Sequence, residues 1–280
     1  MISSIIQLIL AFQSFHLLNG RIIDMTYTFN SDTYYWPGSK NFNRTVIFKG
    51  STGKFWYYAN EMEFAEHGGT HLDAPSHFYK DKWNVDDIPI ERLIAPVYVI
   101  DIKSKAEKDS SALLETEDIQ AFEKNNNVKI ERKSIILMNS GWQERLGNKT
   151  LYFGNDKNNA SDFHFPGFHP DAAEWLIKER DIVGIGVDTA SVDHGPSSDF
   201  LTHVAISKGN VYGLENVANM DKIPKMGAKL TVLPMKIGKG SGGPVRILAE
   251  WDTQSGGADA LNPLFMLSNL ITIFLLVLFL

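Results

Sequence analysis

The chain has 280 residues, of which 44% are hydrophobic and 21% are charged. This length and balance are ordinary for a folded globular protein with a substantial core. The formal net charge is −6, which argues against a nucleic-acid-binding protein because a phosphate-binding surface needs a basic excess. No cysteine is present, so catalysis by a thiol and metal binding by thiolates are excluded.

The first segment, residues 1–20, is apolar over most of its length and ends in Asn19 and Gly20. An apolar run followed by small residues predicts a secretory signal peptide. No lysine or arginine precedes the run, and a buried N-terminal strand or helix is the alternative.

Residues 66–78 read EHGGTHLDAPSHF and hold three of the eight histidines of the chain, His67, His71 and His77, together with Asp73. Neutral imidazole and carboxylate groups are ligands for zinc, manganese and iron. The segment therefore predicts a metal site. A chance cluster of surface or hydrogen-bonded histidines is the alternative.

Two glycines and a proline, Gly68, Gly69 and Pro75, interrupt this segment. They disfavour both a continuous helix and a central strand. We expect a loop whose side chains converge on one point.

Short runs rich in valine and isoleucine follow, and they predict strands that are covered on both faces. These runs are Val97–Ile102, Ser134–Asn139, Ile182–Asp188 and Lys229–Ile237. Helices are predicted at residues 116–126, capped by Thr116, and at residues 169–180, where Pro170 begins the helix. Strand, helix and strand in succession predict a βαβ unit in an α/β fold with a mixed sheet.

Three further segments are predicted to be structural. The polar, asparagine-rich residues 147–162 are expected to form a surface excursion. Asp188 and Asp193 end a buried strand, where structural hydrogen bonding is favoured over a role in positioning the metal loop. Residues 238–243, GKGSGG, lack the spacing of a phosphate-binding or dinucleotide-binding loop and predict a flexible turn.

The last segment, residues 253–280, has small residues, a short polar spacer and an apolar end. This order predicts a signal for a lipid anchor, and a permanent tail anchor is the alternative. Glycosylation sequons begin at Asn43, Asn148 and Asn159. Together with the signal peptide, these features predict a membrane-anchored glycoprotein of the secretory pathway, at the cell surface or outside the cell.

The string HGGTHLDAPSH resembles the His-x-Gly-Thr-His-x-Asp-x-Pro-x-His signature of the cyclase-like metal hydrolases, which include kynurenine formamidases and isatin hydrolases. Other strings that resemble family blocks are RIIDMTYTFNSDTYYWPG, FPGFHPDAAEWL, GVDTASVD, HVAISKGNVYGLENV and GGPVRILA. The resemblance covers residues 21–251. The expected fold is a single α/β domain over residues 21–252, with a mixed sheet of the swivelling β/β/α type.

This resemblance implies that His67, His71 and Asp73 bind a first divalent metal ion, Zn²⁺ or Mn²⁺. In the formamidase branch the aspartate bridges to a second ion, which His203 and Glu215 match here. In the isatin hydrolase branch a single manganese is bound, and the residue matching His203 assists the chemistry. GVDTASVD favours the second branch.

Two more residues match positions of the family. His77 matches the proposed acid and base, and a histidine that titrates near neutral pH suits that role. A fourth ligand or a partner of a ligand is the alternative for His77. Trp36 matches the tryptophan that lies against an aromatic substrate, and core packing is its alternative.

The expected function is metal-dependent hydrolysis of a linear or cyclic C–N amide bond. An aryl formamide such as N-formylkynurenine, whose hydrolysis is a step of tryptophan catabolism, and an isatin-like lactam are the expected substrate types. The expected partners are a small aromatic amide, the membrane and a second copy in a homodimer. A non-catalytic surface binding protein is the alternative, because an anchored location is unusual for a catabolic enzyme. Lactone hydrolysis and dehydration are further alternatives.

Overall fold

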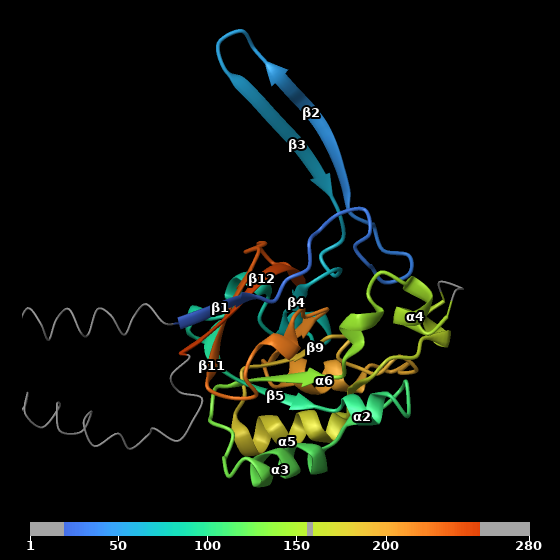
Figure 1. The fold of residues 1–280 in the computed structure, drawn as a ribbon, viewed down its shortest axis with the longest axis vertical. Helices are drawn as coiled ribbons and strands as arrows, with labels where there is room; N and C mark the ends of the chain where they lie inside the picture. Colours follow the sequence, from blue (N-terminus) through green and yellow to red (C-terminus); the bar gives the residue numbers. More distant parts are fainter. Residues whose placement is uncertain (1–19, 156–158, 253–280) are drawn as a thin grey trace, which may run out of the picture. The chain divides into compact units, whose positions relative to one another are not determined.

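The computed structural model describes residues 20–155 and 159–252 (Figure 1). Contacts divide the chain into two units. The larger unit spans residues 23–249, and the described residues of the smaller one are 20–22 and 250–252. Apart from Gly20, the expected signal peptide and C-terminal tail lie outside the described residues, so the expected division at residues 20 and 252 stays a prediction.

The main sheet has the strand order β1-β12-β11-β5-β7-β9-β10-β4. Since β4 also pairs with β12, the seven strands from β12 to β4 close into a barrel-like ring. Strands β5, β7, β9 and β10 run parallel, whereas β4 and β11 pair antiparallel with their neighbours β10 and β5. The strands are β1 (Gly20–Asp24), β4 (His71–Asp73), β5 (Ile94–Asp101), β7 (Ile135–Asn139), β9 (Gly184–Val187), β10 (Tyr212–Glu215), β11 (Ala228–Pro234) and β12 (Gly242–Asp252).

The fold is thus a mixed α/β domain with a closed sheet, which confirms the α/β class and the mixed sheet. The finer swivelling β/β/α type stays a prediction. Each apolar run predicted as a strand overlaps one, namely β5, β7, β9 and β11. Every residue of β7 and β9 is buried, which explains why these strands lack polar alternation.

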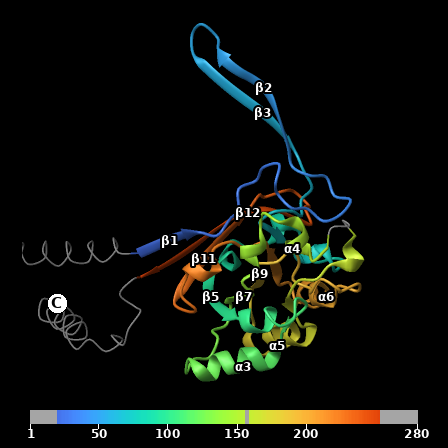
Figure 2. The ribbon, with the colours of Figure 1, turned by 45° about the vertical axis from the view of Figure 1, so that its right-hand side comes forward.

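Helices α3 and α5 lie side by side in both views (Figure 2). Leu176 of α5 and Ile119 of α3 belong to a hydrophobic core that also includes Ile136 and Met138 of β7. The helices are α2 (Lys103–Ala106), α3 (Thr116–Asn125), α4 (Lys149–Phe153), α5 (Pro170–Arg180) and α6 (Leu201–Lys208). Short 3₁₀ turns are η1 (Pro75–His77), η2 (Val85–Asp87), η3 (Ile90–Arg92), η4 (Trp142–Arg145), η5 (Ala160–Asp162) and η6 (Met220–Lys222).

Both predicted helices are present, and β7, α5 and β9 confirm the βαβ unit because β7 and β9 pair in parallel. The predicted cap of α3 is wrong by one residue. Glu115 is the N-cap, and its side chain and that of Asp118 form a reciprocal capping box. Thr116 is instead the first helical residue.

The surface excursion predicted for residues 147–162 is wrong in part. Helix α4 begins after Asn148, whose side chain accepts a hydrogen bond from the backbone N–H of Leu151. Tyr152 and Phe153 are buried, and they pack with Trp142 in an aromatic cluster. The asparagine-rich composition predicted a surface segment, but the segment contains a short helix whose aromatic side chains face the core.

The loop predicted for residues 66–78 contains a central strand, so that prediction is wrong in part as well. Strand β4 has only three residues and pairs with β10 on one side and with β12 on the other. It fits between Gly69 and Pro75, because a strand this short needs neither residue in its ladder. The glycines and the proline border the strand rather than exclude it.

Strands β2 (Asn43–Ser51) and β3 (Trp56–Glu63) form a separate two-stranded sheet. This hairpin extends away from the barrel in Figures 1 and 2. A bulge at Ile47 shifts the register between Val46 and Phe48. Another two-residue pairing joins β6 (Leu113–Leu114) to β8 (Gly167–Phe168).

Candidate metal centre

Three side chains of the centre come from the pairing of β4 with β10. His71 and Asp73 are two residues apart on β4, so both point to the same face of the strand. Glu215 lies directly opposite His71 in the antiparallel ladder, and Gly213 lies opposite Asp73. His71, Asp73 and Glu215 are buried, and each offers a ligand atom within 4.8 Å of the other two.

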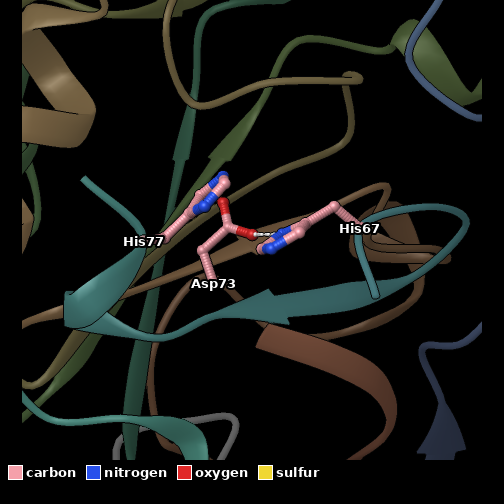
Figure 3. Close-up of side chains that lie close together, drawn as sticks. All are labelled: His67, Asp73 and His77. Atoms are coloured by element: carbon pink, nitrogen blue, oxygen red, sulfur yellow. Dashed lines mark hydrogen bonds and ion pairs between the residues drawn. The ribbon is translucent and has the colours of Figure 1, made fainter. Parts of the chain in front are cut away.

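The two remaining histidines of the motif flank this strand. His67 precedes β4, and His77 ends the turn η1 that follows it. Figure 3 shows the Asp73 carboxylate beside the two imidazoles. The His67 and His77 rings are stacked, with centroids 3.8 Å apart, and ligand atoms of His67, Asp73 and His77 lie within 4.8 Å of one another.

His203 enters the centre from helix α6. Asp193 holds it there, because Asp193 Oδ2 accepts hydrogen bonds from the His203 backbone N–H at 3.1 Å and from its ring Nδ1 at 2.6 Å. Asp193 Oδ1 accepts the neighbouring backbone N–H of Thr202 at 2.9 Å. The carboxylate therefore caps the start of the helix and orients the histidine with the same two oxygens.

The two oxygens of Asp73 face different partners. Oδ1 lies 2.6 Å from His67 Nδ1 and 3.2 Å from His71 Nε2. Oδ2 lies 3.1 Å from His203 Nε2, which is itself 3.2 Å from Glu215 Oε1. Glu215 Oε2 lies 3.4 Å from His71 Nε2. Asp73 thus stands between two groups of nitrogen and oxygen donors.

Hydrogen bonds on the far side of two rings decide which nitrogen faces the centre. The Nδ1 of His71 bonds to the Gly69 carbonyl at 2.9 Å, and the Nδ1 of His203 bonds to Asp193. Both acceptors require a protonated Nδ1, so Nε2 presents its lone pair to the carboxylates when the ring is neutral. Neutral imidazoles and carboxylates converging in this way fit a divalent cation.

The pKa values express the same crowding of charge. Burial lowers the pKa of His71, but the charge and hydrogen bond of Asp73, the charge of Glu215 and the hydrogen bond of Gly69 together raise it to about 9. Burial raises the pKa of Glu215, and the charge of Asp73 raises it further. Burial lowers the pKa of His77 to about 4. Hence the His77 imidazole is neutral at neutral pH, whereas the negatively charged carboxylates attract cations.

A cavity of about 250 Å³ opens over these residues. Its aromatic wall includes Trp36, which packs edge-on against Phe163 with ring centroids 5.2 Å apart and lies 6.2 Å from Phe200. Phe78 is also part of the wall, with its ring centroid 4.3 Å from that of His203. The cavity is therefore polar at the donor cluster and aromatic around it.

The structure brings all seven predicted site residues to this cavity. They are Trp36, His67, His71, Asp73, His77, His203 and Glu215. The structural hydrogen bonding predicted for Asp193 is confirmed, and it acts on the site because one of its acceptors orients His203. The signal was its position ten residues before His203 at the end of a predicted strand, a place where α/β proteins gather functional groups.

Comparisons with known proteins agree with this geometry. A family model described as "Putative cyclase" matches residues 23–194. An isatin hydrolase from Roseibium aggregatum is 36% identical over 71% of this chain and 76% of its own length. A kynurenine formamidase from Bacillus cereus is 30% identical over 80% of this chain and 94% of its own length. A crystal structure of an isatin hydrolase bound to the product analogue thioisatinate has a TM-score of 0.78 and 30% identity, and it covers 88% of this chain and 99% of its own.

Together, the fold, the donor cluster and these relatives define a metal-dependent hydrolase that cleaves amide bonds. More particularly, the chain belongs to the putative cyclase family.

The expected membrane-anchored or extracellular location is wrong. The relatives are named as isatin hydrolase and kynurenine formamidase, which does not support an anchored surface protein. Within residues 20–155 and 159–252, no helix has the length and apolar character that crossing a bilayer requires. The segments that motivated the expectation, 1–19 and 253–280, lie outside the described residues.

Proposed function

We propose that this protein hydrolyses the C–N bond of an aromatic lactam of the isatin type. The observation that carries the proposal is the aromatic cavity placed directly over the donor cluster. Support also comes from relatives named as isatin hydrolases, one matched in sequence and another in structure. An aryl formamide such as N-formylkynurenine is the second candidate, and the kynurenine formamidase relatives favour it.

The donor cluster offers places for one or two divalent ions. His67, His71 and Asp73 Oδ1 would hold the first ion, and Asp73 Oδ2, His203 and Glu215 would hold the second. Mixed nitrogen and oxygen donors suit Zn²⁺ and Mn²⁺ alike. A bound ion of this kind lowers the pKa of water and polarises a carbonyl group.

His77 would move the proton of the reaction. Its neutral ring can accept a proton from the water that attacks the lactam carbonyl carbon. As the new C–O bond forms and the C–N bond breaks, the same ring returns the proton to the departing nitrogen. The products are a carboxylate and an aniline-type amine on one opened molecule.

Trp36 would bind the aromatic part of the substrate. The indole is half-buried, and Phe163 and Phe200 restrict its movement. A flat bicyclic ring gains both area burial and ring-to-ring attraction against such a wall. The lactam carbonyl is then directed toward the donor cluster.

The test is hydrolysis by purified protein that has been stripped of metal and reloaded with Zn²⁺ or Mn²⁺. We expect isatin to be opened by the reloaded protein and not by the stripped protein, with an aryl formamide assayed alongside to distinguish the two substrate classes. Elemental analysis gives the number and identity of the ions that the protein retains. If the reloaded protein opens neither substrate, the proposed function is wrong.

We also propose that the protein is a homodimer in which hairpin β2–β3 contacts the second copy. The hairpin exposes large apolar side chains on both faces, namely Val46, Ile47, Phe48, Phe55, Trp56, Tyr57, Tyr58 and Met62. Aromatic side chains bury roughly 150–250 Å² each, so eight half-exposed large side chains offer on the order of the ~800 Å² that each partner buries in a stable complex. A second copy of the chain would supply a partner of matching area.

A further inference from the structure

The glycine-rich segment 238–243 is not a free turn, because its central serine is hydrogen-bonded to the residue that precedes the first histidine of the motif. Glu66 Oε2 accepts hydrogen bonds from the backbone N–H of Ser241 at 3.1 Å and from its hydroxyl group at 2.7 Å. The same hydroxyl oxygen lies 2.8 Å from Nε2 of His67. On its other side, His67 Nδ1 lies 2.6 Å from Asp73 Oδ1. Glu66, Ser241, His67 and Asp73 thus form a continuous chain into the centre.

A count of protons gives this chain a direction. A carboxylate has acceptors only, and a serine hydroxyl has one hydrogen. Since Ser241 donates that hydrogen to Glu66, its oxygen can only accept from His67, and Nε2 must carry the ring proton. Metal binding requires the neutral imidazole, which has one N–H, so in the metal-bound form Nδ1 is the nitrogen left with a lone pair.

His67 therefore turns the opposite ring nitrogen toward the centre from the one that His71 and His203 turn toward it. His71 and His203 have their Nδ1 atoms occupied by Gly69 and Asp193 and turn Nε2 toward the centre. His67 has its Nε2 occupied by Ser241 and turns Nδ1 toward the centre. In sequence the pair is far apart, since 174 positions separate His67 from Ser241.

Glycines on either side of Ser241 allow the close approach that this contact needs. A Cβ atom at Gly242 would lie 2.5 Å from Cε1 of His67 and 2.5 Å from the Leu72 carbonyl oxygen. A Cβ atom at Gly240 would lie 3.1 Å from Glu66 Oε1. Gly242 is also paired with Asp73 in the ladder between β12 and β4. The predicted turn is right in part: Gly238 and Lys239 form a turn, whereas β12 begins at Gly242 and pairs there with the metal-binding loop.

We propose that Ser241 and Glu66 are positioning residues that hold His67 in the tautomer with a protonated Nε2, so that Nδ1 is the atom that binds the metal ion. This inference rests on the proposed metal site. Hydrogen-bonded partners of a ligating histidine set its tautomer and orientation, and their loss costs roughly 10–100-fold in metal affinity or activity.

The experiment measures Zn²⁺ binding to the metal-free protein by competition with a chromophoric chelator. We expect Ser241→Ala and Glu66→Ala to weaken binding roughly 10–100-fold, and Ser241→Thr, which keeps a hydroxyl group, to stay near the wild type. Ser76→Ala is the matched control. Ser76 lies in the same loop, and its buried hydroxyl has no hydrogen-bond partner among the described residues, so its loss should leave Zn²⁺ affinity unchanged.

A second readout addresses the tautomer itself. In the Zn²⁺-loaded wild-type protein, nitrogen-15 NMR of the histidine rings should place the His67 proton on Nε2. In Ser241→Ala this proton should lose its protection from exchange with solvent. A His67 proton on Nδ1, or Zn²⁺ affinity of the Ser241→Ala variant equal to that of the wild type, overturns the proposal.

The outcomes separate this inference from the proposed function. Tight Zn²⁺ binding that Ser241→Ala weakens, in a protein that opens no lactam, supports the positioning role and rejects the substrate. Lactam hydrolysis with unchanged binding in Ser241→Ala rejects the positioning role alone. A wild-type protein that binds no divalent ion rejects both.

Discussion

Two neighbouring regions of the chain, the loop 66–78 and the hairpin of β2 and β3, differ in how they treat side chains: the loop buries polar groups, whereas the hairpin exposes apolar ones. In residues 66–78 the polar groups of His71 and Asp73 are buried and held by partners from β10 and α6. In the hairpin of β2 and β3, Trp56 is 65% exposed, and Phe55, which lies in the turn between the two strands, is 61% exposed. A single two-stranded sheet is only marginally stable in water, whereas the loop 66–78 includes a strand that is paired on both edges.

The difference indicates which side chains find their partners within the domain and which remain available to another molecule. Buried polar groups are tolerated when they are fully hydrogen-bonded, and the buried imidazole of His71 and carboxylate of Asp73 find their partners within the same domain. A large exposed apolar surface marks an interaction site. We therefore expect catalysis to depend on the loop and association between copies to depend on the hairpin.

The largest effect is expected for Asp73→Asn. Both groups of donors share Asp73, so the substitution removes a charge from each of them. We expect the metal content to fall below half of the wild-type value and kcat/KM to fall by roughly 1,000-fold or more, because metal ions supply several kcal/mol of transition-state stabilisation. Glu61→Gln, which changes an exposed carboxylate of the hairpin, is the control and should leave both quantities unchanged.

The next effect concerns His77→Gln. General acid and base catalysis contributes typically 10²–10⁴-fold, so kcat should fall within roughly that range. Metal content, measured by elemental analysis, should stay at the wild-type value if His77 moves protons. If metal content falls together with kcat, His77 is a ligand, as its place beside His67 and Asp73 also allows.

A matched pair of glycine variants compares the stability of the two regions. A Cβ atom at Gly68 would lie 2.1 Å from the Tyr35 ring, whereas one at Gly53, in the hairpin turn, meets nothing within 4 Å. We expect Gly68→Ala to cost about 3 kcal/mol of unfolding free energy through overpacking. Gly53→Ala should cost about 1 kcal/mol, because its φ of +85° strains an alanine. Urea unfolding measures both, and equal costs would contradict the packing of Tyr35 on Gly68.

The smallest effect on catalysis is expected for the double variant Phe55→Ser, Trp56→Ser. These side chains lie at the turn of the hairpin and away from the cavity residues, so kcat/KM should stay within about twofold of the wild type. The molecular mass in light scattering should fall from that of a dimer to that of a monomer, because two exposed aromatic anchors are lost. A monomeric wild-type protein would reject the dimer.

Sequence patterns predicted those parts of the molecule that depend on local information. The apolar runs marked β5, β7, β9 and β11 because strands buried on both faces lack polar positions. Spacing within one short motif brought His67, His71, Asp73 and His77 together.

Long-range pairing accounts for what the patterns missed. Strand β4 is only three residues long, and it is stabilised by ladders with strands far away in sequence. The hairpin lacks the polar alternation that usually identifies an exposed strand. Ser241 acts on His67 across 174 positions, and no local pattern reveals such a contact.

The position of β4 in the ring has a consequence for the stability of the protein. Because the strand that carries His71 and Asp73 is the one that closes the seven-stranded ring, the binding site is complete only when β4 is paired with both β10 and β12. A metal ion that binds only the closed ring stabilises it against unfolding by RT ln(1 + [L]/Kd), where [L] is the free metal concentration and Kd is the dissociation constant.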